Sequence, residues 1–543
     1  MAKSDPCAIW ILQGWAFMNQ RKFWTQPRFK AFLDAIPNDR MAVLDLYCET
    51  HPMWSVTDAF CGKPWLWCNV QSFGRTVALG AALATNNDGV HAARRDPRGG
   101  RLVGLGFVNE GLCYNPVAYD LMLEAAWRDG PVNLNTWIGD YARHRYGRDN
   151  AAARRAWAAL LETVLNVPSR GVSAVTQTPT LGRLRWLAPY DTARLADAWR
   201  ELLDAADELG AEDTYRFDLV NVARQVLADH AGVLHGMLIR AWADKDVARF
   251  DEASRRFLEL INDLDDLLVT RKEFLLGEWL EDARRWGATP DERARCEWNA
   301  RRVLTMWGAT TAINDYARKQ WSGMLRGYYA PRWKRYLDAA RDALVAHRTF
   351  DAAGANDDLL QWQDRWSEDT ERHPTMARGE SVAVARALWS KHHAQFKSET
   401  IVRDAVSLTT DKPVRCSGAL PPYPARLAND GARSDTDRYW ATDVQRDPAT
   451  WWQVDLGKPT TVGRVVVVCY FGDSRHYGFT VEVSDDATHW ELVADRKDNE
   501  EPSTEAGYTC TFPPRETRHI RVTQTSNSAN TGRHLVEVMA YGR

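Results

Sequence analysis

One glutamate, Glu110, lies in a sequence context suited to catalysis. It follows a short apolar run within Gly106-Phe107-Val108-Asn109-Glu110-Gly111, where glycines allow a ligand to approach the backbone. A carboxylate at the end of a strand can act as nucleophile or general acid/base in glycoside cleavage, a reaction that normally uses two carboxylates. On position alone, an equally simple interpretation is that Glu110 caps the segment that follows it.

Two further carboxylates, Asp45 and Glu49, follow an earlier apolar run. Asp45 can either orient substrate hydroxyl groups or pair with a neighbouring arginine, and the sequence does not decide between these roles. We interpret His51 as a loop histidine with satisfied hydrogen bonds. The sequence has no phosphate-binding P-loop and no dinucleotide-binding glycine motif between a strand and a helix.

Four apolar runs must position these residues. We predict buried strands at 8–12, 41–46, 64–70 and 102–107, with a helix at 28–35. Apolar strands alternating with helices are typical of a parallel sheet covered on both faces, and the carboxyl ends of its strands carry the site. Four strands in about 130 residues make half of a (β/α)8 barrel, which needs about 250 residues.

The chain divides into three predicted domains. Residues 1–130 form the half-barrel, residues 131–400 an all-α domain, and residues 401–543 an antiparallel β-sandwich rich in alternating strands and turns. In the all-α domain, a helix is predicted at 192–210, capped by Asp191 and ended by Gly210. Its apolar face carries Leu195, Trp199, Leu202, Ala206 and Leu209, and a second helix repeats the spacing at Phe257, Ile261, Leu264 and Leu268.

Composition narrows the possible partners. The chain has 543 residues, with 69 Lys+Arg against 72 Asp+Glu. It therefore has no excess of positive charge that would favour binding to nucleic acid. The longest apolar stretch, near 465–469, has the length of a strand, so we expect no membrane span. The 25 tryptophans indicate either flat platforms for sugar rings or filler in large cores.

Long motifs, several of them rich in tryptophan, occur in unbroken order over about residues 8 to 395. In the predicted barrel they are Ala8-Ile9-Trp10-Ile11-Leu12-Gln13-Gly14-Trp15, Val43-Leu44-Asp45-Leu46-Tyr47, Trp67-Cys68, Ser72-Phe73-Gly74 and Asn109-Glu110-Gly111. In the helical region they are Leu304-Thr305-Met306-Trp307-Gly308, Ile313-Asn314-Asp315-Tyr316-Ala317-Arg318-Lys319-Gln320 and Tyr328-Tyr329-Ala330-Pro331-Arg332-Trp333. These motifs resemble the alpha-N-acetylglucosaminidases, the family 89 glycoside hydrolases.

The resemblance implies an exo-acting, retaining hydrolase that removes terminal alpha-linked N-acetylglucosamine from glycans through a covalent glycosyl-enzyme. It implies no catalytic cofactor and a secreted or cell-surface location, although residues 1–12 do not have the pattern of a signal peptide. Glu110 matches the family's nucleophile. The matching sugar-pocket positions are Trp15, Leu46, Val70 and Phe73 from the barrel, and Trp307, Ile313 and Tyr316 from the helical domain. For the last three, plain interdomain packing is the alternative.

Two departures from the family pattern bear on activity. The family's general acid/base glutamate precedes the segment that matches 8–10, so we expect this chain to lack it, together with the first half of the barrel. We therefore expect a mis-set start, a frameshift or a separate chain carrying the missing half-barrel. A pocket histidine of the family is also replaced in Arg170-Gly171-Val172. The alternative function is that of a catalytically inactive or split-gene fragment that binds glycans.

The last region resembles the discoidin-like, coagulation factor 5/8 type C modules, which imply carbohydrate binding. The matching motifs are Trp451-Trp452-Gln453-Val454-Asp455-Leu456-Gly457, Tyr477-Gly478-Phe479-Thr480-Val481-Glu482-Val483-Ser484-Asp485-Asp486, Trp490, His519-Ile520-Arg521-Val522 and Leu535-Val536-Glu537-Val538. Such modules often hold a structural calcium ion, for which Asn429, Asp430 and Glu537 are candidate ligands, with ordinary turn chemistry as the alternative. The loop with Tyr470, Arg475 and His476 is a candidate sugar contact.

Overall fold

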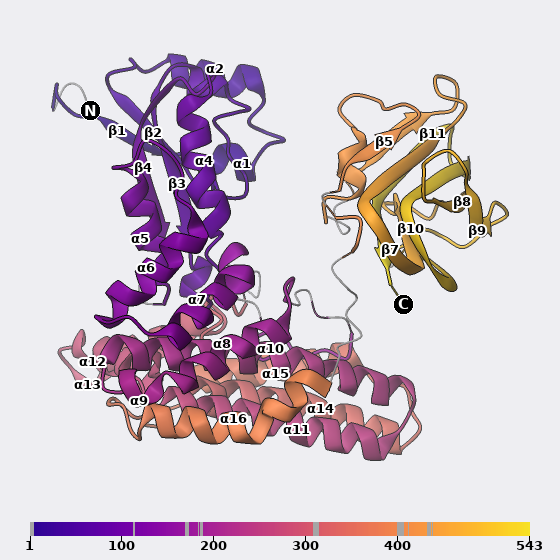
Figure 1. The fold of residues 1–543 in the computed structure, drawn as a ribbon. Helices are drawn as coiled ribbons and strands as arrows, with labels where there is room; N and C mark the ends of the chain where they lie inside the picture. The colour runs from indigo at the N-terminus through magenta and orange to yellow at the C-terminus, as the bar shows by residue number, and fades with distance from the viewer. Residues whose placement is uncertain are drawn as a thin grey trace. The chain divides into compact units, whose positions relative to one another are not determined.

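The chain folds into two compact units, Met1–Glu399 and Thr400–Arg543 (Figure 1). The computed structural model describes residues 5–111, 114–168, 173–182, 184, 188–307, 314–398, 407–410, 412–431, 436, 438–505 and 507–542. None of the described helices combines the length and the apolar character that a bilayer span demands.

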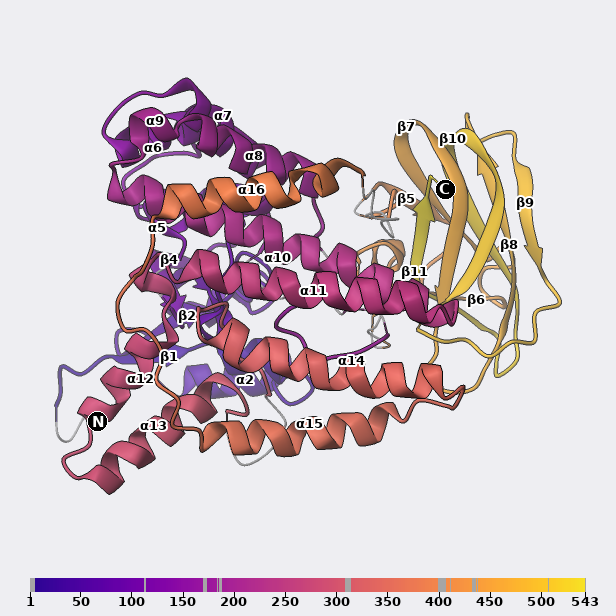
Figure 2. The same ribbon diagram turned by 90° about the horizontal axis from the view of Figure 1, so that it is seen from below.

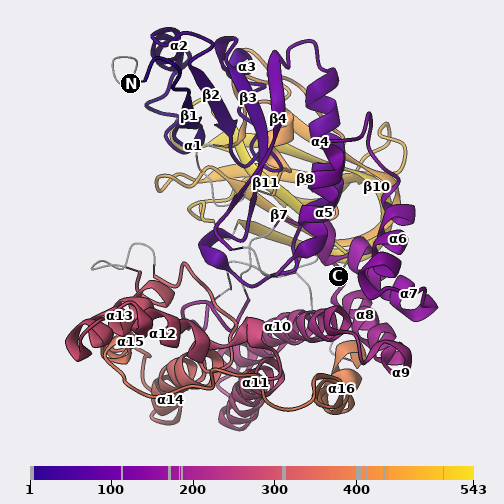
Figure 3. The same ribbon diagram turned by 90° about the vertical axis from the view of Figure 1, so that its left-hand side faces the viewer.

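The first unit opens with a four-stranded parallel sheet in the order β1-β2-β3-β4 (Figure 3). Its strands are β1 (Trp10–Gln13), β2 (Met41–Asp45), β3 (Pro64–Gln71) and β4 (Arg101–Asn109). Each lies within two residues of a predicted strand at either end, and the predicted parallel pairing is confirmed. The carboxyl ends of all four strands therefore meet at one edge of the sheet, as the sequence predicts for the site.

Short helices accompany this sheet. They are α1 (Trp15–Asn19), α2 (Gln26–Asp34), α3 (Asp58–Cys61), α4 (Leu83–Arg95) and α5 (Pro116–Ala125). Close packing of α4 on β3 depends on Gly89, because a Cβ there would lie 3.2 Å from the ring of Trp67. A core that includes Phe29, Phe60 and Trp65 fills the space between the helices and the sheet.

The prediction of a buried first strand is wrong. Ile9 and Ile11 are 57% and 56% exposed, and Val103 on β4 is exposed as well. Within the described residues, β1 pairs with β2 alone and β4 pairs with β3 alone. The apolar runs of these edge strands therefore lack the neighbours that would bury them in a closed barrel.

The rest of the first unit is an array of helices, as predicted (Figure 2). They are α6 (Leu134–Tyr146), α7 (Ala151–Glu162), α8 (Thr192–Asp204), α9 (Ala206–Leu209), α10 (Asp213–Ala243), α11 (Val247–Leu268), α12 (Leu276–Arg285), α13 (Pro290–Leu304), α14 (Ala330–Val345), α15 (Ala352–Ser367) and α16 (Ser381–Ser398). The longest, α10, packs against α11, α8 and α16, so its buried side chains form the centre of the array.

The helix predicted at 192–210 is present but divided between α8 and α9. Asp191 caps α8 as expected, because its side chain accepts hydrogen bonds from the amides of Ala193 and Arg194. The break falls at Ala205, and α9 ends at Gly210 as predicted. The predicted apolar faces of this helix pair and of α11 are buried.

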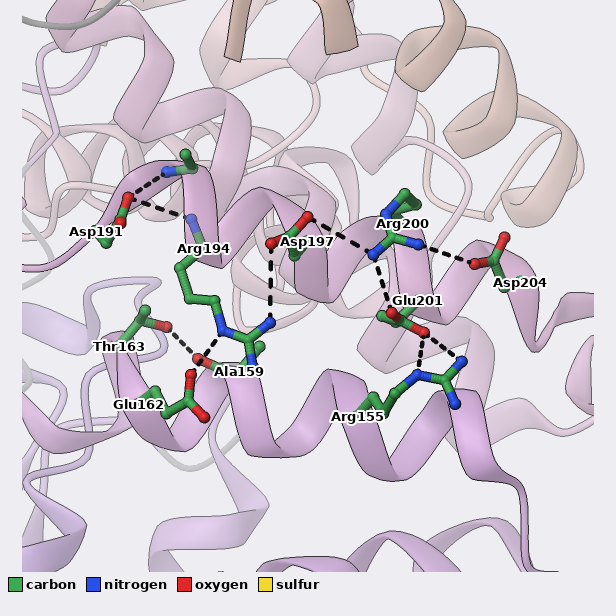
Figure 4. Close-up of polar contacts among 11 residues, drawn as sticks. Arg155, Ala159, Glu162, Thr163, Asp191, Arg194, Asp197, Arg200, Glu201 and Asp204 are labelled. Carbon is green, nitrogen blue, oxygen red and sulfur yellow. Dashed lines mark hydrogen bonds and ion pairs between the residues drawn. The ribbon is translucent and has the colours of Figure 1, made fainter. Parts of the chain in front are cut away.

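Ion pairs join α7 to α8 along their exposed sides (Figure 4). Arg155 of α7 pairs with Glu201 of α8 at 2.7 Å, and Glu162 of α7 pairs with Arg194 of α8 at 2.6 Å. Glu201 is buried, whereas Arg155, Glu162 and Arg194 reach solvent. Ion pairs with solvent-exposed members contribute little each, so the register of the two helices is set mainly by the apolar face beneath them.

The second unit is an antiparallel β module, as the sequence predicts. Its strands are β5 (Val414–Cys416), β6 (Trp440–Asp443), β7 (Trp451–Cys469), β8 (Tyr477–Ser484), β9 (Glu491–Arg496), β10 (Tyr508–Asn527) and β11 (Gly532–Tyr541). The strand order is β6-β11-β7-β10-β8-β9, with β5 beside β7. Trp440, Trp452 and Phe479 lie in its buried core, which matches the period-two pattern of a sandwich.

Candidate active site

Glu110 lies directly after β4, and both of its carboxylate oxygens accept hydrogen bonds. The amide of Gly74 donates to Oε2 at 2.6 Å, and the hydroxyl of Tyr316 donates to Oε1 at 3.2 Å. Gly74 belongs to a turn after β3, whereas Tyr316 comes from the helical domain. Glu110 itself is exposed, so an accessible carboxylate is held in place from two sides.

The turn after β3 has an unusual backbone. Ser72, Gly74 and Arg75 have φ values of 61°, 64° and 59°, in the left-handed region. Gly74 has no substitute here, because a Cβ would lie 2.0 Å from the carbonyl oxygen of Tyr316. The guanidinium of Arg75 lies 5.0 Å from the ring centre of Trp279 on α12, which anchors the turn to the helical domain. Such strain clusters at functional sites.

Tyr316 is half-buried beside Trp307, with ring centres 5.1 Å apart in an edge-to-face arrangement. Burial, together with the nearby charge of Glu110 and the hydrogen bond to it, raises the pKa of Tyr316 to about 12. The hydroxyl is therefore a neutral donor at physiological pH. Ile313, predicted for the same wall, lies outside the described residues, as does Arg170-Gly171-Val172.

The barrel-side pocket residues form a single cluster. Phe73 and Trp15 have ring centres 5.9 Å apart, and Leu46 and Val70 pack with them. Leu46 and Val70 are almost fully buried, whereas Trp15 and Phe73 are half-buried, so the two aromatic side chains are the more accessible part of the cluster. Tyr47 also belongs to the cluster, with its ring centre 5.1 Å from that of Phe73. No role was predicted for Tyr47 from the sequence. Its signal was its place directly after β2.

The carboxyl groups of Asp45 and Glu49 accept hydrogen bonds from backbone amides rather than pairing with an arginine. Asp45 accepts from the amides of Met53 and Trp54 at 2.8–3.1 Å, and Glu49 accepts from the amide of Val70 at 3.1 Å. Burial raises the pKa of Asp45 to about 6 and that of Glu49 to about 8. Asp45 therefore fixes the backbone at Met53 and Trp54, and Glu49 fixes the segment after β2 to strand β3.

The predicted calcium ligands lie near one another in the second unit. The amide nitrogen of Asn429 donates to the carbonyls of Thr409 and Lys412, and the amide of Gly431 donates to the buried carboxylate of Glu537 at 3.2 Å. In contrast, the carboxylate of Asp430 pairs with Arg438 at 2.6 Å. Asn429 and Glu537 fit an oxygen-rich site, and Asp430 fits poorly because a guanidinium competes with a cation there. Across the part of the chain that the structure describes, no three His, Cys, Asp or Glu side chains converge as metal ligands.

An aromatic cluster surrounds the predicted sugar-contact loop of the same unit. Tyr423 and Tyr439 stack with ring centres 4.5 Å apart, and Tyr470 lies 5.7 Å from Tyr439. The guanidinium of Arg475 lies 4.8 Å from the ring centre of Tyr470. His534 contacts Tyr439, and burial lowers its pKa to about 4, so it is neutral. Tyr423, Tyr439 and His534 were missed because they come from distant parts of the sequence.

Two models of one protein family match the first unit. The Alpha-N-acetylglucosaminidase (NAGLU) tim-barrel domain matches residues 1–129, and the Alpha-N-acetylglucosaminidase (NAGLU) C-terminal domain matches residues 137–391. The chain belongs to the alpha-N-acetylglucosaminidase family. In the second unit, a NedA-like, galactose-binding domain matches residues 427–522. The predicted family and the combination with a discoidin-like module are therefore confirmed.

Known alpha-N-acetylglucosaminidases are similar over the same region. The human Alpha-N-acetylglucosaminidase is 33% identical over 402 residues, which is 73% of this chain and 54% of the human protein. A family 89 glycoside hydrolase from Clostridium perfringens, solved in complex with PUGNAc, is 25% identical with a TM-score of 0.65. A variant of CpGH89 from Clostridium perfringens with two Glu-to-Gln substitutions, solved in complex with its substrate GlcNAc-alpha-1,4-galactose, matches with the same identity and TM-score. These matches cover 74% and 73% of this chain and 46% of the bacterial chains, so the chain spans about half the length of the relatives that it matches.

Proposed function

We propose that the chain is part of a retaining exo-glycosidase that removes terminal alpha-linked N-acetylglucosamine, with Glu110 as nucleophile. The observation that supports this most is the exposed carboxylate of Glu110, which is held by Gly74 and Tyr316 beside aromatic side chains. Faces of Trp15, Phe73 and Trp307 suit the C–H faces of a sugar ring. The similar enzyme from Clostridium perfringens has GlcNAc-alpha-1,4-galactose as its substrate.

In this mechanism a Glu110 oxygen attacks the anomeric carbon while the bond to the leaving oxygen breaks. Water then cleaves the glycosyl ester and returns the carboxylate. A retaining pair of carboxyl groups stands about 5–5.5 Å apart. Asp45 and Glu49 are unsuited as the partner, because both are buried and accept hydrogen bonds from backbone amides, Asp45 from Trp54 and Glu49 from Val70 of β3.

We infer that the acid/base carboxylate is supplied by polypeptide that completes the barrel beside β1 and β4. Ile11 on β1, Val103 on β4 and Ile9 directly before β1 are exposed apolar residues that fit such a neighbour better than they fit water. Native mass spectrometry of the protein from its source tests this inference. An assembly heavier than the 61.7 kDa of this chain supports it, and a functional particle of 61.7 kDa contradicts it.

The direct test of the reaction uses two substrates. A 4-nitrophenyl alpha-N-acetylglucosaminide requires little acid assistance, and a 2,4-dinitrophenyl analogue requires almost none, because its leaving group is a weak base. Turnover of the second substrate that disappears in Glu110→Gln supports Glu110 as nucleophile. Equal turnover by the wild type and Glu110→Gln contradicts the assignment.

A second candidate function is glycan binding without catalysis, favoured by the aromatic cluster of the second unit. Tyr439, Tyr470, Arg475 and His534 are half-buried and combine aromatic faces with hydrogen-bond donors, as sugar sites do. If the protein is also an enzyme, this cluster serves as the glycan-binding site of the second unit. Glycan-array binding by an inactive protein, with no turnover of either aryl substrate, would support this candidate alone.

We also propose that a calcium ion stabilises the second unit through Glu537, Asn429 and neighbouring carbonyl groups. Support comes from the burial of Glu537 and its closeness to the turn that holds Asn429 and Gly431. The ion would supply no chemistry to the reaction.

A further inference from the structure

The support of Glu110 is divided between two distant parts of the chain. Gly74 lies in the barrel region, and Tyr316 follows Glu110 by 206 residues. Because each donor binds a different carboxylate oxygen, losing one leaves the carboxylate free to rotate about the remaining hydrogen bond. The position of Tyr316 therefore controls the orientation of the Glu110 carboxylate.

A buried ion pair holds the residue next to Tyr316. Asp315 has a φ of 59°, and its carboxylate lies 2.5 Å from Nη1 of Arg332 on α14. Both side chains are buried. The amide of Asp315 also donates to the carbonyl of Thr305 at 2.7 Å, so backbone and side chain are both fixed.

Arg332 is in turn fixed by the body of the helical domain. Its Nη2 donates to the carbonyl of Gln177 at 2.8 Å, and its guanidinium stacks on the rings of Tyr328 and Tyr329 at about 5 Å. A short π-helix at Leu325–Tyr329 directly precedes α14, and single turns of π-helix are frequent at functional sites. The pair therefore links the residue directly before Tyr316 to helix α14.

We propose that Tyr316 orients Glu110 and stabilises its returning charge, and that the Asp315–Arg332 pair is the positioning element that presents Tyr316. This inference rests on the proposed role of Glu110 as nucleophile. It assigns Tyr316 to the reacting carboxylate rather than only to a wall of the sugar pocket.

The charge on Glu110 changes during the proposed reaction. Glycosylation converts the carboxylate into an ester, and hydrolysis restores the negative charge as the bond from the anomeric carbon to the Glu110 oxygen breaks. A hydrogen bond from Tyr316 is strongest to the full carboxylate, so it favours the second step. Removing the hydroxyl should therefore slow hydrolysis of the glycosyl-enzyme more than its formation.

The first experiment measures Tyr316→Phe with the 2,4-dinitrophenyl substrate, whose leaving group makes the first step fast. We expect kcat to fall about 10- to 100-fold, KM to fall with it, and the glycosyl-enzyme to accumulate in intact-mass spectra. A fall in kcat with a raised KM and no accumulated adduct would contradict the proposal. A wild type that neither turns over nor forms an adduct would instead contradict the proposed function.

The second experiment tests the contact without requiring activity. 3-Fluorotyrosine at position 316 provides a 19F resonance that we expect to shift in Glu110→Gln and in Asp315→Asn. Arg341→Met is the matched control, because Arg341 lies on the same helix α14 and pairs with Asp251 in an exposed site. It should leave the resonance unchanged.

Two results would overturn the proposal in this assay. One is a resonance that does not respond to Glu110→Gln, and the other is an equal response to Asp315→Asn and Arg341→Met. Asp315→Asn preserves the shape of the side chain, so we expect the variant to fold. A thermal unfolding curve of the variant checks that it does. Arg332→Met removes the other partner of the pair and should shift the resonance as Asp315→Asn does; if Arg332→Met unfolds the protein, Asp315→Asn alone tests the positioning pair.

Discussion

Gly74 and Tyr316 meet at a point where no side chain fits. A Cβ on residue 74 would lie 2.0 Å from the carbonyl oxygen of Tyr316, and the φ of 64° is itself unfavourable for other residues. The same glycine presents its amide to Glu110. One residue therefore sets both the approach of the helical domain and the orientation of the Glu110 carboxylate.

Substitution of Gly74 should accordingly disable the site. We expect Gly74→Ala to lower kcat/KM on an aryl alpha-N-acetylglucosaminide at least 100-fold, because the turn must move and take its amide away from Glu110. Gly104→Ala is the control, since a Cβ there meets Leu66 at an ordinary 3.6 Å. Equal effects of the two variants would show that the contact at residue 74 is unimportant.

Stability should depend on pH through Glu49. Its folded-state pKa of about 8 lies above the usual value because of burial, so the folded protein binds a proton that the unfolded chain releases. The stabilisation is fully present at low pH and is lost as pH rises toward 8, at about 1.4 kcal/mol per pH unit. Asp45, with a pKa of about 6, adds to the same trend at lower pH.

Denaturant unfolding of the wild type and Glu49→Gln between pH 5.5 and 7.5 measures this dependence. The variant should show a flatter profile, because its amide does not titrate. Glu278→Gln changes an exposed carboxylate and should retain the wild-type slope. A Glu49→Gln profile as steep as that of the wild type would contradict the assignment.

The packing of α16 on α8 should depend on one tryptophan. Trp199 is fully buried, and its ring lies 5.3 Å from that of Trp389 on α16. We expect Trp199→Ala to cost about 3–5 kcal/mol of stability, whereas Trp286→Ala, at a residue 86% exposed, should change it by less than about 0.5 kcal/mol. Chemical denaturation followed by circular dichroism provides both values.

Glycan binding by the second unit should require Tyr470. We expect Tyr470→Ala to weaken binding of the full chain to a glycan array or affinity gel about 10-fold or more, because it removes a ring and the support of Arg475. His489→Ala changes an exposed histidine in another turn and should bind normally. Retained binding by Tyr470→Ala would place the site elsewhere.

Calcium removal should lower the melting temperature of the second unit. An ion at 100 times its dissociation constant stabilises by about 2.7 kcal/mol, an amount that differential scanning calorimetry with and without chelator resolves. Glu537→Gln should abolish the difference, and the exposed Glu516→Gln should preserve it. Identical melting curves with and without chelator in the wild type would refute the proposed ion.

The strands and the capped helix were predictable because their signals are local. Apolar runs marked β2, β3 and β4, and Asp191 marked the start of α8. Burial of β1 was predicted wrongly, since an apolar run does not reveal whether a neighbouring strand exists.

The contact between Tyr316 and Glu110 was not predictable in the same way. Tyr316 was assigned to the pocket wall only through resemblance to a family. Its place beside Glu110 depends on left-handed backbone at Ser72, Arg75 and Asp315, and of these only the aspartate is a residue type enriched in that conformation.

The 206 residues between Glu110 and Tyr316 also impose an order in time on synthesis. A ribosome adding about 5–20 residues per second needs about 10 to 40 s to travel from one to the other. Throughout that interval the Glu110 carboxylate can accept a hydrogen bond from Gly74 but not from Tyr316, which has not yet been synthesised. The arrangement of Gly74, Glu110 and Tyr316 is therefore completed late, after most of the helical domain has been translated, and a chain released early would carry Glu110 without its second donor.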